Sequence, residues 1–228
     1  MAEFFSRLLA VFDINPEATK GLAEKQARVL GSPAEVAAEA EVVFACMPTI
    51  DSFHAIVSGP DGVLQGATQN NRMKTFVNLG TMGTEAVGQI EAIMNAKGIG
   101  MLDSPITGGV QRAWDGDITV VSSGPGEVFD QVEPFLQSFA RDIHYVGDQI
   151  GQAEAAEAIG ACENKPDVML EDALDALHCQ EKLNGGLPAA AVREGARRYR
   201  LWWNAMRNAA FLNTDDFGML RSASTGLA

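Results

Sequence analysis

The sequence predicts an α/β protein, with a mainly parallel sheet followed by a short all-helical region. Apolar runs of strand length alternate with helical segments from about residue 7 to residue 146. Strands separated by helices in this way form right-handed βαβ units, which build parallel sheets. From about Gly151 the chain is rich in alanine and glutamate and carries no strand-like run. We therefore expect a sheet-containing domain over residues 1–147 and an all-helical domain over residues 151–228.

Each strand is expected where a short apolar run meets a turn residue. The run EVVFACM is almost continuously apolar and stops at Pro48, as a strand buried on both faces should. The expected strands are RLLAVFD (residues 7–13), EVVFACM (41–47), TFVNL (75–79), GIGML (98–102), DITVV (117–121) and DIHYV (142–146).

The helices between these strands carry start and stop signals. Ser32 precedes a helical segment and Glu35 follows three residues later, which is the pattern of a capping box. Thr84 is the expected N-cap of the helix TEAVGQIEAIMN, and Gly98 is its expected C-terminal stop. These signals support the alternation of strands and helices.

The segment DSPITGG (residues 103–109) is unusual for the end of a strand. Pro105 has no N–H group and is expected to end the preceding strand. Gly108 and Gly109 can adopt positive φ angles, and the exposed N–H groups of such a turn, beside the Thr107 hydroxyl, suit a carboxylate or phosphate. The residues alone leave two alternatives, an anion cradle or a tight turn that binds nothing.

Composition excludes several classes of protein. Hydrophobic residues make up 46% and charged residues 21%, which is ordinary for a globular protein, and no uninterrupted apolar run is long enough to predict a membrane span. The net charge of −13 disfavours nucleic acid as a partner. Cys46, Cys162 and Cys179 lie far apart, which argues against a disulfide framework or a metal site. The N-terminus has no signal-peptide pattern, so we expect a cytoplasmic protein, or one of an organelle matrix.

Asp13 ends the first expected strand. In a dinucleotide-binding fold, an acidic residue at the end of the second strand binds the adenosine ribose, about 20 residues after a glycine-rich phosphate loop. Only twelve residues precede Asp13 here, and none is glycine. Either Asp13 ends an ordinary strand, or the chain begins inside a dinucleotide-binding unit.

Five segments occur together in the order and spacing of one family. They are RLLAVFDINPEA (residues 7–18), CMP (46–48), VNLGT (77–81), DSPITGG (103–109) and AxxGDITVVSSG (113–124). By these segments the chain resembles the β-hydroxyacid dehydrogenases, which include 3-hydroxyisobutyrate dehydrogenase and tartronate semialdehyde reductase and are related to 6-phosphogluconate dehydrogenase. The resemblance covers about residues 7–152, and DSPITGG is its most specific part.

The resemblance implies a Rossmann-type dinucleotide-binding domain, incomplete because its first strand and glycine loop are missing, followed by the all-helical domain. Asp13 would hold the adenosine ribose and favour NAD over NADP, because its charge repels a 2′-phosphate. NADP is the alternative cofactor. Met47 and Pro48 would line the cofactor, and Thr81 would lie near the nicotinamide ribose.

The resemblance also implies a substrate and a reaction. Thr107, with Gly108 and Gly109, would grip the carboxylate of a small 3-hydroxy acid or its semialdehyde during hydride transfer. The family carries a catalytic lysine four residues after a glycine, where this chain has Ala155, and a methyl group cannot transfer a proton. Lys165 is the nearest other lysine. No catalytic residue is therefore assigned, and the second interpretation is a non-catalytic relative that binds a ligand or partner on the same fold.

A helix expected over residues 193–212 carries arginines interleaved with Tyr199, Trp202 and Trp203. Interleaved arginine and aromatic residues can bind single-stranded nucleic acid. An amphipathic helix that packs inward or against another subunit is the favoured alternative. We therefore expect a homo-oligomer that binds a small molecule and no nucleic acid.

Overall fold

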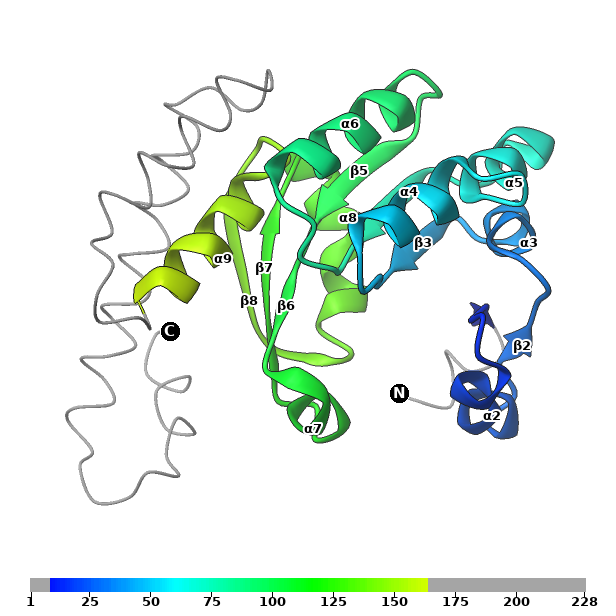
Figure 1. The fold of residues 1–228 in the computed structure, drawn as a ribbon, viewed down its shortest axis with the longest axis horizontal. Coiled ribbons are helices and arrows are strands. Elements are labelled where there is room, and N and C mark those ends of the chain that lie inside the picture. The colour runs from blue at the N-terminus through cyan, green and yellow to red at the C-terminus, as the bar shows by residue number, and fades with distance from the viewer. Residues whose placement is uncertain (1–8, 164–228) are drawn as a thin grey trace.

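A computed structural model describes residues 9–163 of the chain, in which strands and helices alternate (Figure 1). In chain order the elements are β1 (Ala10–Val11), α2 (Pro16–Glu24), β2 (Arg28–Val29), α3 (Pro33–Glu39), β3 (Val42–Ala45), α4 (Ile50–Ser58), α5 (Val63–Asn70), β4 (Thr75–Asn78), α6 (Thr84–Asn95), β5 (Gly100–Asp103), β6 (Ile106–Thr107), α7 (Gly109–Trp114), β7 (Ile118–Ser123), α8 (Gly126–Leu136), β8 (Ala140–Gly147) and α9 (Gln152–Glu163).

The main sheet has six strands and is mainly parallel. β3, β4 and β5 lie side by side in parallel, with Thr75 of β4 opposite Val42 on one side and Gly100 on the other. β7 and β8 form a second parallel pair. The expected fold class, an α/β protein of Rossmann type, is confirmed.

Strand pairing in the main sheet changes from parallel to antiparallel at DSPITGG (residues 103–109). β5 ends at Asp103, and β6 then pairs with β7 in the antiparallel direction, with Thr107 opposite Thr119. Pro105 lies between the two strands, and its carbonyl accepts a hydrogen bond from the Val121 N–H at 3.1 Å. The expectation that Pro105 ends the strand is confirmed, because β5 ends at Asp103 and Pro105 belongs to no strand. Its carbonyl still bonds to β7, because proline lacks only the donor and keeps its acceptor.

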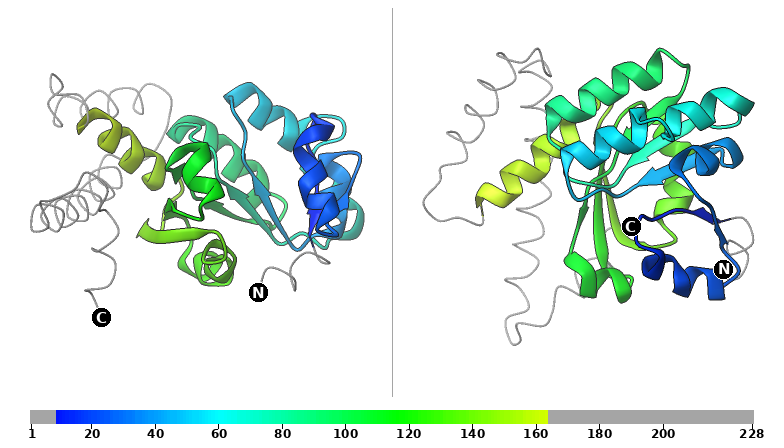
Figure 2. Two further views of the ribbon diagram at one scale, coloured as in Figure 1. Left: turned by 90° about the horizontal axis from the view of Figure 1, so that it is seen from below. Right: turned by 45° about the vertical axis from the view of Figure 1, so that its right-hand side comes forward.

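Helices cover both faces of the main sheet (Figures 1 and 2). Adjacent residues of a strand point to opposite faces. Phe76 is buried in a cluster with Phe53 of α4 and Ile90 of α6, whereas Val77 is buried in a second cluster with Val132 of α8. Two apolar clusters on opposite faces of one sheet make a three-layered core.

β1 and β2 form a separate two-stranded parallel sheet. In the described part of the strand expected over residues 7–13, Ala10 and Val11 pair with Arg28 and Val29. α3 contacts both β1 and β3 and so links the two sheets. Among the described residues, no strand joins β1 to β3.

The start of α3 follows the predicted capping pattern. The Ser32 hydroxyl accepts a hydrogen bond from the Glu35 N–H at 3.2 Å. The Glu35 carboxylate accepts from the N–H of Gly31 at 2.8 Å, one residue before the cap. The N-cap at Ser32 is confirmed, with the reciprocal bond shifted by one residue.

The start of α6 differs from the prediction. Its N-cap is Gly83, which has no side chain to cap the helix, and Thr84 is already the first helical residue. The carboxylate of Glu154, from α9, accepts a hydrogen bond from the Met82 N–H at 2.6 Å instead. The prediction of Thr84 as the cap is wrong, because a distant carboxylate serves this helix end.

α9 is the part of the expected helical domain that the structure describes. Its first turn docks on the sheet, where the Ala153 N–H donates to the Ser123 hydroxyl at 3.0 Å. The remainder of that domain, with Lys165 and the helix over residues 193–212, lies outside the described residues, so these expectations stay predictions. No helix within residues 9–163 is long and apolar enough to cross a membrane.

Candidate active site at the carboxyl edge of the sheet

The carboxyl ends of three parallel strands bring the predicted site residues to one edge of the sheet. Met47 and Pro48 follow β3, Thr81 follows β4, and Asp103 is the last residue of β5. In open α/β sheets, ligands bind outside the carboxyl ends of the strands. Thr107 follows Asp103 by four residues and lies at the same edge.

The side chain of Asn78, at the end of β4, is hydrogen-bonded to the end of β5. Its fully buried side chain donates to the Gly80 carbonyl at 2.7 Å and to the Asp103 carboxylate at 3.0 Å. Gly80 lies so close to the turn after β3 that an added Cβ would be 2.9 Å from the carbonyl oxygen of Met47. Glycine therefore allows the three strand ends to approach one another.

The turn after β6 has the predicted backbone geometry. Gly108 has a φ of 139° and Gly109 a φ of 74°, both in the region that side chains other than glycine rarely adopt. Thr107 is exposed at the end of β6, directly before this turn. The positive φ angles expected from the sequence are confirmed.

Glu157 of α9 connects Thr81 and Thr107. The Thr81 hydroxyl donates to one carboxylate oxygen of Glu157 at 2.9 Å, and the Thr107 hydroxyl donates to the other. The two threonines are 26 residues apart in the chain and belong to different strand ends. Their hydroxyls thus converge on a single carboxylate.

Two buried carboxyl groups lie close to this bridge. Burial raises the pKa of Asp103 well above its ordinary value, and the neighbouring Glu154 carboxyl raises it further. Burial also raises the pKa of Glu154, from 4.5 to about 7. One oxygen of Asp103, Oδ2, is buried without a hydrogen-bond partner among the described residues. Both carboxyl groups therefore keep their protons to a higher pH than exposed carboxyl groups do, because burial beside other carboxyl groups disfavours the charged form.

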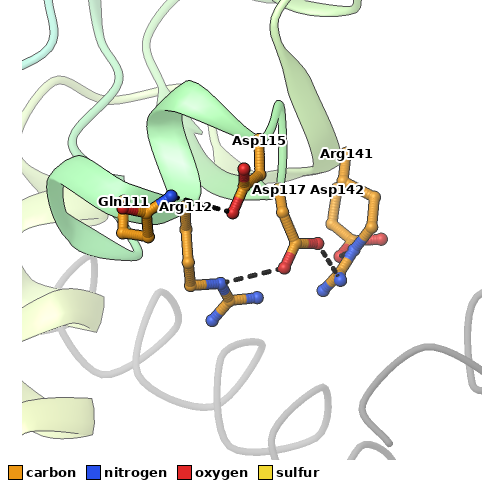
Figure 3. Close-up of polar contacts among 6 residues, drawn as sticks. All are labelled: Gln111, Arg112, Asp115, Asp117, Arg141 and Asp142. Atoms are coloured by element: carbon orange, nitrogen blue, oxygen red, sulfur yellow. Dashed lines mark hydrogen bonds and ion pairs between the residues drawn. The ribbon is translucent and has the colours of Figure 1, made fainter. Parts of the chain in front are cut away.

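A charged network holds the helix that follows the glycine turn (Figure 3). Arg112 of α7 binds Asp117 at 3.1 Å, and Arg141 of β8 binds the other oxygen of Asp117. Arg141 also binds its neighbour Asp142 at 2.8 Å. Because Asp117 directly precedes β7, the network ties α7 to β7 and β8 and so orients the Thr107 turn.

Asp13 follows β1, which belongs to the separate two-stranded sheet. It is exposed after β1, and its carboxylate accepts a hydrogen bond from the Asn15 N–H at 2.7 Å. Asp13 and Met47 both line a cavity of about 460 Å³ between β1 and β3. The structure thus groups Asp13 with Met47 and groups Thr81 with Thr107.

Ala155 occupies the position at which a lysine is expected. It is fully buried on α9, one residue after Glu154 and two before Glu157. No group of three or more metal-ligating side chains that could hold a metal ion is found within residues 9–163.

A match to a known protein family identifies the kind of domain that carries this sheet edge. The model of the NAD binding domain of 6-phosphogluconate dehydrogenase matches residues 7–147. The chain belongs to this family. The strand ends described above are therefore those of an NAD-binding domain.

Individual relatives of this NAD-binding domain carry different names. The 3-hydroxyisobutyrate dehydrogenase of Pseudomonas aeruginosa is 30% identical over 138 residues, which cover 60% of this chain and 45% of the relative. The cytokine-like nuclear factor N-PAC of Danio rerio is 25% identical over 130 residues, covering 57% of this chain and 28% of the relative. The chain thus spans less than half the length of these curated relatives.

A solved structure agrees in fold. The crystal structure of 3-hydroxyisobutyrate dehydrogenase from Salmonella typhimurium superposes with a TM-score of 0.59 at 17% identity, covering 92% of this chain and 90% of that chain. At this identity the likeness concerns the fold alone.

The residues of this NAD-binding domain fit one part of a dinucleotide better than another. Asp13 and Met47 flank the cavity at the carboxyl ends of β1 and β3, where a ribose and its base could lie. A pyrophosphate needs backbone N–H groups at a glycine-rich turn and a helix N-terminus. The described turn after β1 instead leads through Asn15 into Pro16, which has no N–H to donate.

Sequence reasoning missed four residues of the site: Asn78, Asp103, Glu154 and Glu157. Asn78 and Asp103 are polar residues at the ends of otherwise apolar strands, and this position is a usable signal. Glu154 and Glu157 are three residues apart and so lie on one face of a helix. Whether these side chains point toward the sheet edge depends on how α9 packs against the sheet, which the sequence does not specify.

Proposed function

We propose that this NAD-binding domain takes part in hydride transfer between NAD(P) and a small 3-hydroxy acid or its semialdehyde, as in dehydrogenases of the 3-hydroxyisobutyrate type. One observation carries the proposal: the hydroxyls of Thr81 and Thr107 converge on a single carboxylate, that of Glu157. A site that holds this carboxylate has the geometry to hold the carboxylate of a hydroxy acid once Glu157 leaves.

The residues have distinct roles in this proposal. Thr107, with the turn at Gly108 and Gly109, binds and orients the substrate carboxylate. Asp13 binds the adenosine ribose and favours NAD, because a carboxylate repels a 2′-phosphate. Met47 and Pro48 line the cofactor. Thr81 lies beside the nicotinamide ribose, close enough to Thr107 for both hydroxyls to reach one carboxylate. The bound dinucleotide supplies or accepts the hydride.

Ala155 favours a second candidate function, a non-catalytic relative that binds a ligand or partner on the same fold. Hydroxyl oxidation requires a group that takes up the hydroxyl proton, and the alanine side chain cannot do so. The relative named as a nuclear factor rather than a dehydrogenase is consistent with this alternative.

Steady-state assays separate the two candidates. The full chain is incubated with NAD or NADP and a panel of 3-hydroxy acids, and reduced cofactor is followed by absorbance. Turnover that falls at least about tenfold in Thr107→Val supports the dehydrogenase, since the lost hydroxyl bonds a charged group. A flat trace from folded protein that still binds a hydroxy acid supports the non-catalytic relative.

We also propose that the protein forms a homo-oligomer in the cytoplasm, through the helix expected over residues 193–212. Two adjacent tryptophans on a helix point about 100° apart, so one can pack inward while the other meets a partner. Light scattering of wild type and Trp203→Ala tests this. A monomer in both would remove the proposal.

A further inference from the structure

The carboxyl groups of Asp103, Glu154 and Glu157 at the edge of the main sheet differ in what they can reach. Asp103 is fully buried, and Glu154 is 3% exposed. Both are hydrogen-bonded within the protein, because Asp103 accepts from the Asn78 amide and Glu154 accepts from the Met82 N–H. Neither of these two carboxyl groups can therefore meet a molecule that arrives from solvent.

Glu157 is the carboxyl group of this set that solvent reaches. Its side chain is half-buried, and it is hydrogen-bonded to Thr81 and Thr107, which are both exposed. Glu154 lies three residues earlier on the same face of α9, the helix that packs beside β7 and β8 (Figure 1). α9 thus brings one buried and one accessible carboxyl group to the same edge.

No lysine within residues 9–163 lies at this edge. Lys74 directly precedes β4 and Lys97 precedes β5, so both lie at the opposite edge of the main sheet. Lys20 belongs to α2 and Lys25 is its C-cap, next to the separate two-stranded sheet. Among the described residues, a proton acceptor at the carboxyl edge must therefore be another kind of side chain.

The shape of a 3-hydroxy acid places its hydroxyl close to its carboxylate. One carbon atom separates the carboxyl carbon from the carbon that bears the hydroxyl. A substrate whose carboxylate binds Thr107 therefore holds its hydroxyl near the same residue. A general base must lie within hydrogen-bond reach of the proton that it accepts. Glu157 meets this requirement, because its carboxylate already accepts the Thr107 hydroxyl.

We propose that Glu157 is the catalytic proton acceptor at this site, an inference that rests on the proposed function. The substrate carboxylate takes over the Thr107 hydroxyl, while Glu157 keeps its bond from Thr81 and accepts a hydrogen bond from the substrate hydroxyl. Glu157 then stands between the residue beside the nicotinamide ribose and the residue that holds the substrate.

The proton and the hydride leave the substrate in opposite directions. In oxidation, the O–H bond of the substrate breaks and its proton bonds to a carboxylate oxygen of Glu157. The C–H bond of the same carbon breaks as a hydride, which goes to NAD(P), and the C=O bond forms. Because Glu157 is only half-buried, water takes up its proton afterwards. In the reverse reaction, the Glu157 carboxyl returns a proton to the oxygen as the hydride reaches carbon.

The Glu157 carboxylate has opposite effects on binding and on the chemical step. Its charge opposes the substrate carboxylate and so weakens binding. It also takes the hydroxyl proton, and a positioned general base typically contributes about 10²–10⁴-fold to the rate. A side chain that only blocked the site would lower both binding and turnover. Replacing Glu157 therefore distinguishes a base from a blocking group.

A pair of ligands tests the contact without cofactor. 3-Hydroxyisobutyrate and isobutyrate share a carboxylate and a carbon skeleton and differ by one hydroxyl. In NMR titrations, wild type should bind the hydroxy acid at least about tenfold more tightly, because its hydroxyl donates to a charged group. Glu157→Ala should bring the ratio of the two affinities close to one. Equal affinities in wild type, or an unchanged ratio in Glu157→Ala, overturn the proposal.

Glu41→Gln is the matched control for this ratio. Glu41 is exposed and precedes β3, at the opposite edge of the main sheet. The control should keep the preference of wild type for the hydroxy acid. A preference lost equally in Glu41→Gln would attribute it to net charge and overturn the proposal. Because both affinities are measured on one variant, a loss of folded protein does not change their ratio.

Steady-state kinetics test the proton transfer. Glu157→Gln has the size of the native side chain but cannot accept the proton, so kcat should fall at least about a hundredfold while the hydroxy acid binds more tightly. Glu157→Asp keeps the carboxylate and should retain more turnover than Glu157→Gln. Turnover of Glu157→Gln at the wild-type rate or above overturns the proposal and leaves the dehydrogenase standing. A wild type that oxidises no 3-hydroxy acid with NAD or NADP overturns the dehydrogenase, and the catalytic role of Glu157 with it.

Discussion

Glu157 sets the charge that an incoming ligand meets at Thr81 and Thr107. Replacing it by glutamine removes one negative charge from the two hydroxyls. We expect Glu157→Gln to bind small 3-hydroxy acids at least about tenfold more tightly, because like charges a few ångströms apart repel strongly at a partly buried site. NMR titration with the hydroxy acid measures the change.

The matched control for Glu157 is Glu41→Gln. Glu41 is exposed and precedes β3, so it lies at the opposite edge of the sheet. The Glu41→Gln substitution removes the same charge from the whole protein but leaves the residues of the site unchanged. Equal affinity gains in both variants would attribute the effect to net charge and contradict a role for Glu157 at the threonines.

The raised pKa of Glu154 predicts how the free energy of unfolding depends on pH. Its pKa in the folded protein is about 7, raised from 4.5 by burial. Between these values the folded state holds a proton that the unfolded state has lost, so the free energy of unfolding falls as pH rises from about 4.5 to about 7. The raised pKa of Asp103 acts in the same direction.

Glu154→Gln should remove most of this pH dependence. The variant cannot ionise, and its amide oxygen can still accept the Met82 N–H. At about pH 8 we expect it to be more stable than wild type by on the order of 3 kcal/mol, with the difference vanishing near pH 4. Urea denaturation across this range measures it. A variant that is less stable at all pH values would contradict the buried charge as the cause.

The element that carries the glycine turn depends on Asp117. This carboxylate binds Arg112 of α7 and Arg141 of β8 (Figure 3). All three side chains are partly exposed, so the network contributes modestly, and we expect Asp117→Asn to cost about 1 kcal/mol of unfolding free energy. The loss should shrink at high salt, because mobile ions screen the pairs.

Asp115→Asn is the control for Asp117. Asp115 accepts from Gln111 of the same helix at 3.4 Å, a contact that does not tie α7 to the sheet. Thermal denaturation should leave this variant within about 0.5 kcal/mol of wild type. Hydroxy acid affinity should also fall only in Asp117→Asn, because only that change frees the turn before α7.

Helix starts separate what local sequence determines from what it does not. Ser32 caps α3 as predicted, because its partner is three residues away in the chain. The expected N-cap of α6 is Thr84, yet the Met82 N–H beside that helix end donates to Glu154, 72 residues further along. A cap within one turn is visible in the sequence, and a cap from another helix is not.

At the scale of the molecule, the order of strands and helices followed from the apolar runs and turn residues, because these are local signals. The pairing of β7 with β5 and β6 did not, since direction is fixed by long-range contacts. The candidate site divides in the same way. Thr107 and its glycines were visible in DSPITGG, whereas the carboxylate that bridges Thr81 and Thr107 comes from α9.

The division of the molecule into two sheets predicts uneven local stability. β1 and β2 pair only with each other among the described strands, whereas β4 is central in the main sheet and fully buried. Regions with few buried apolar contacts open at lower free energy than the core. Hydrogen exchange should therefore be faster in the two-stranded sheet than in β4.

The amides to compare are those of Arg28 and Leu30, which bond to Leu9 and Val11, and that of Leu79, which bonds to Ala45. We expect the first two to be at least about a hundredfold less protected, which corresponds to about 2.7 kcal/mol in opening free energy. NMR-detected exchange of the full chain measures all three in one experiment. Equal protection would mean that the two sheets open as one unit, and it would contradict a break between β1 and β3.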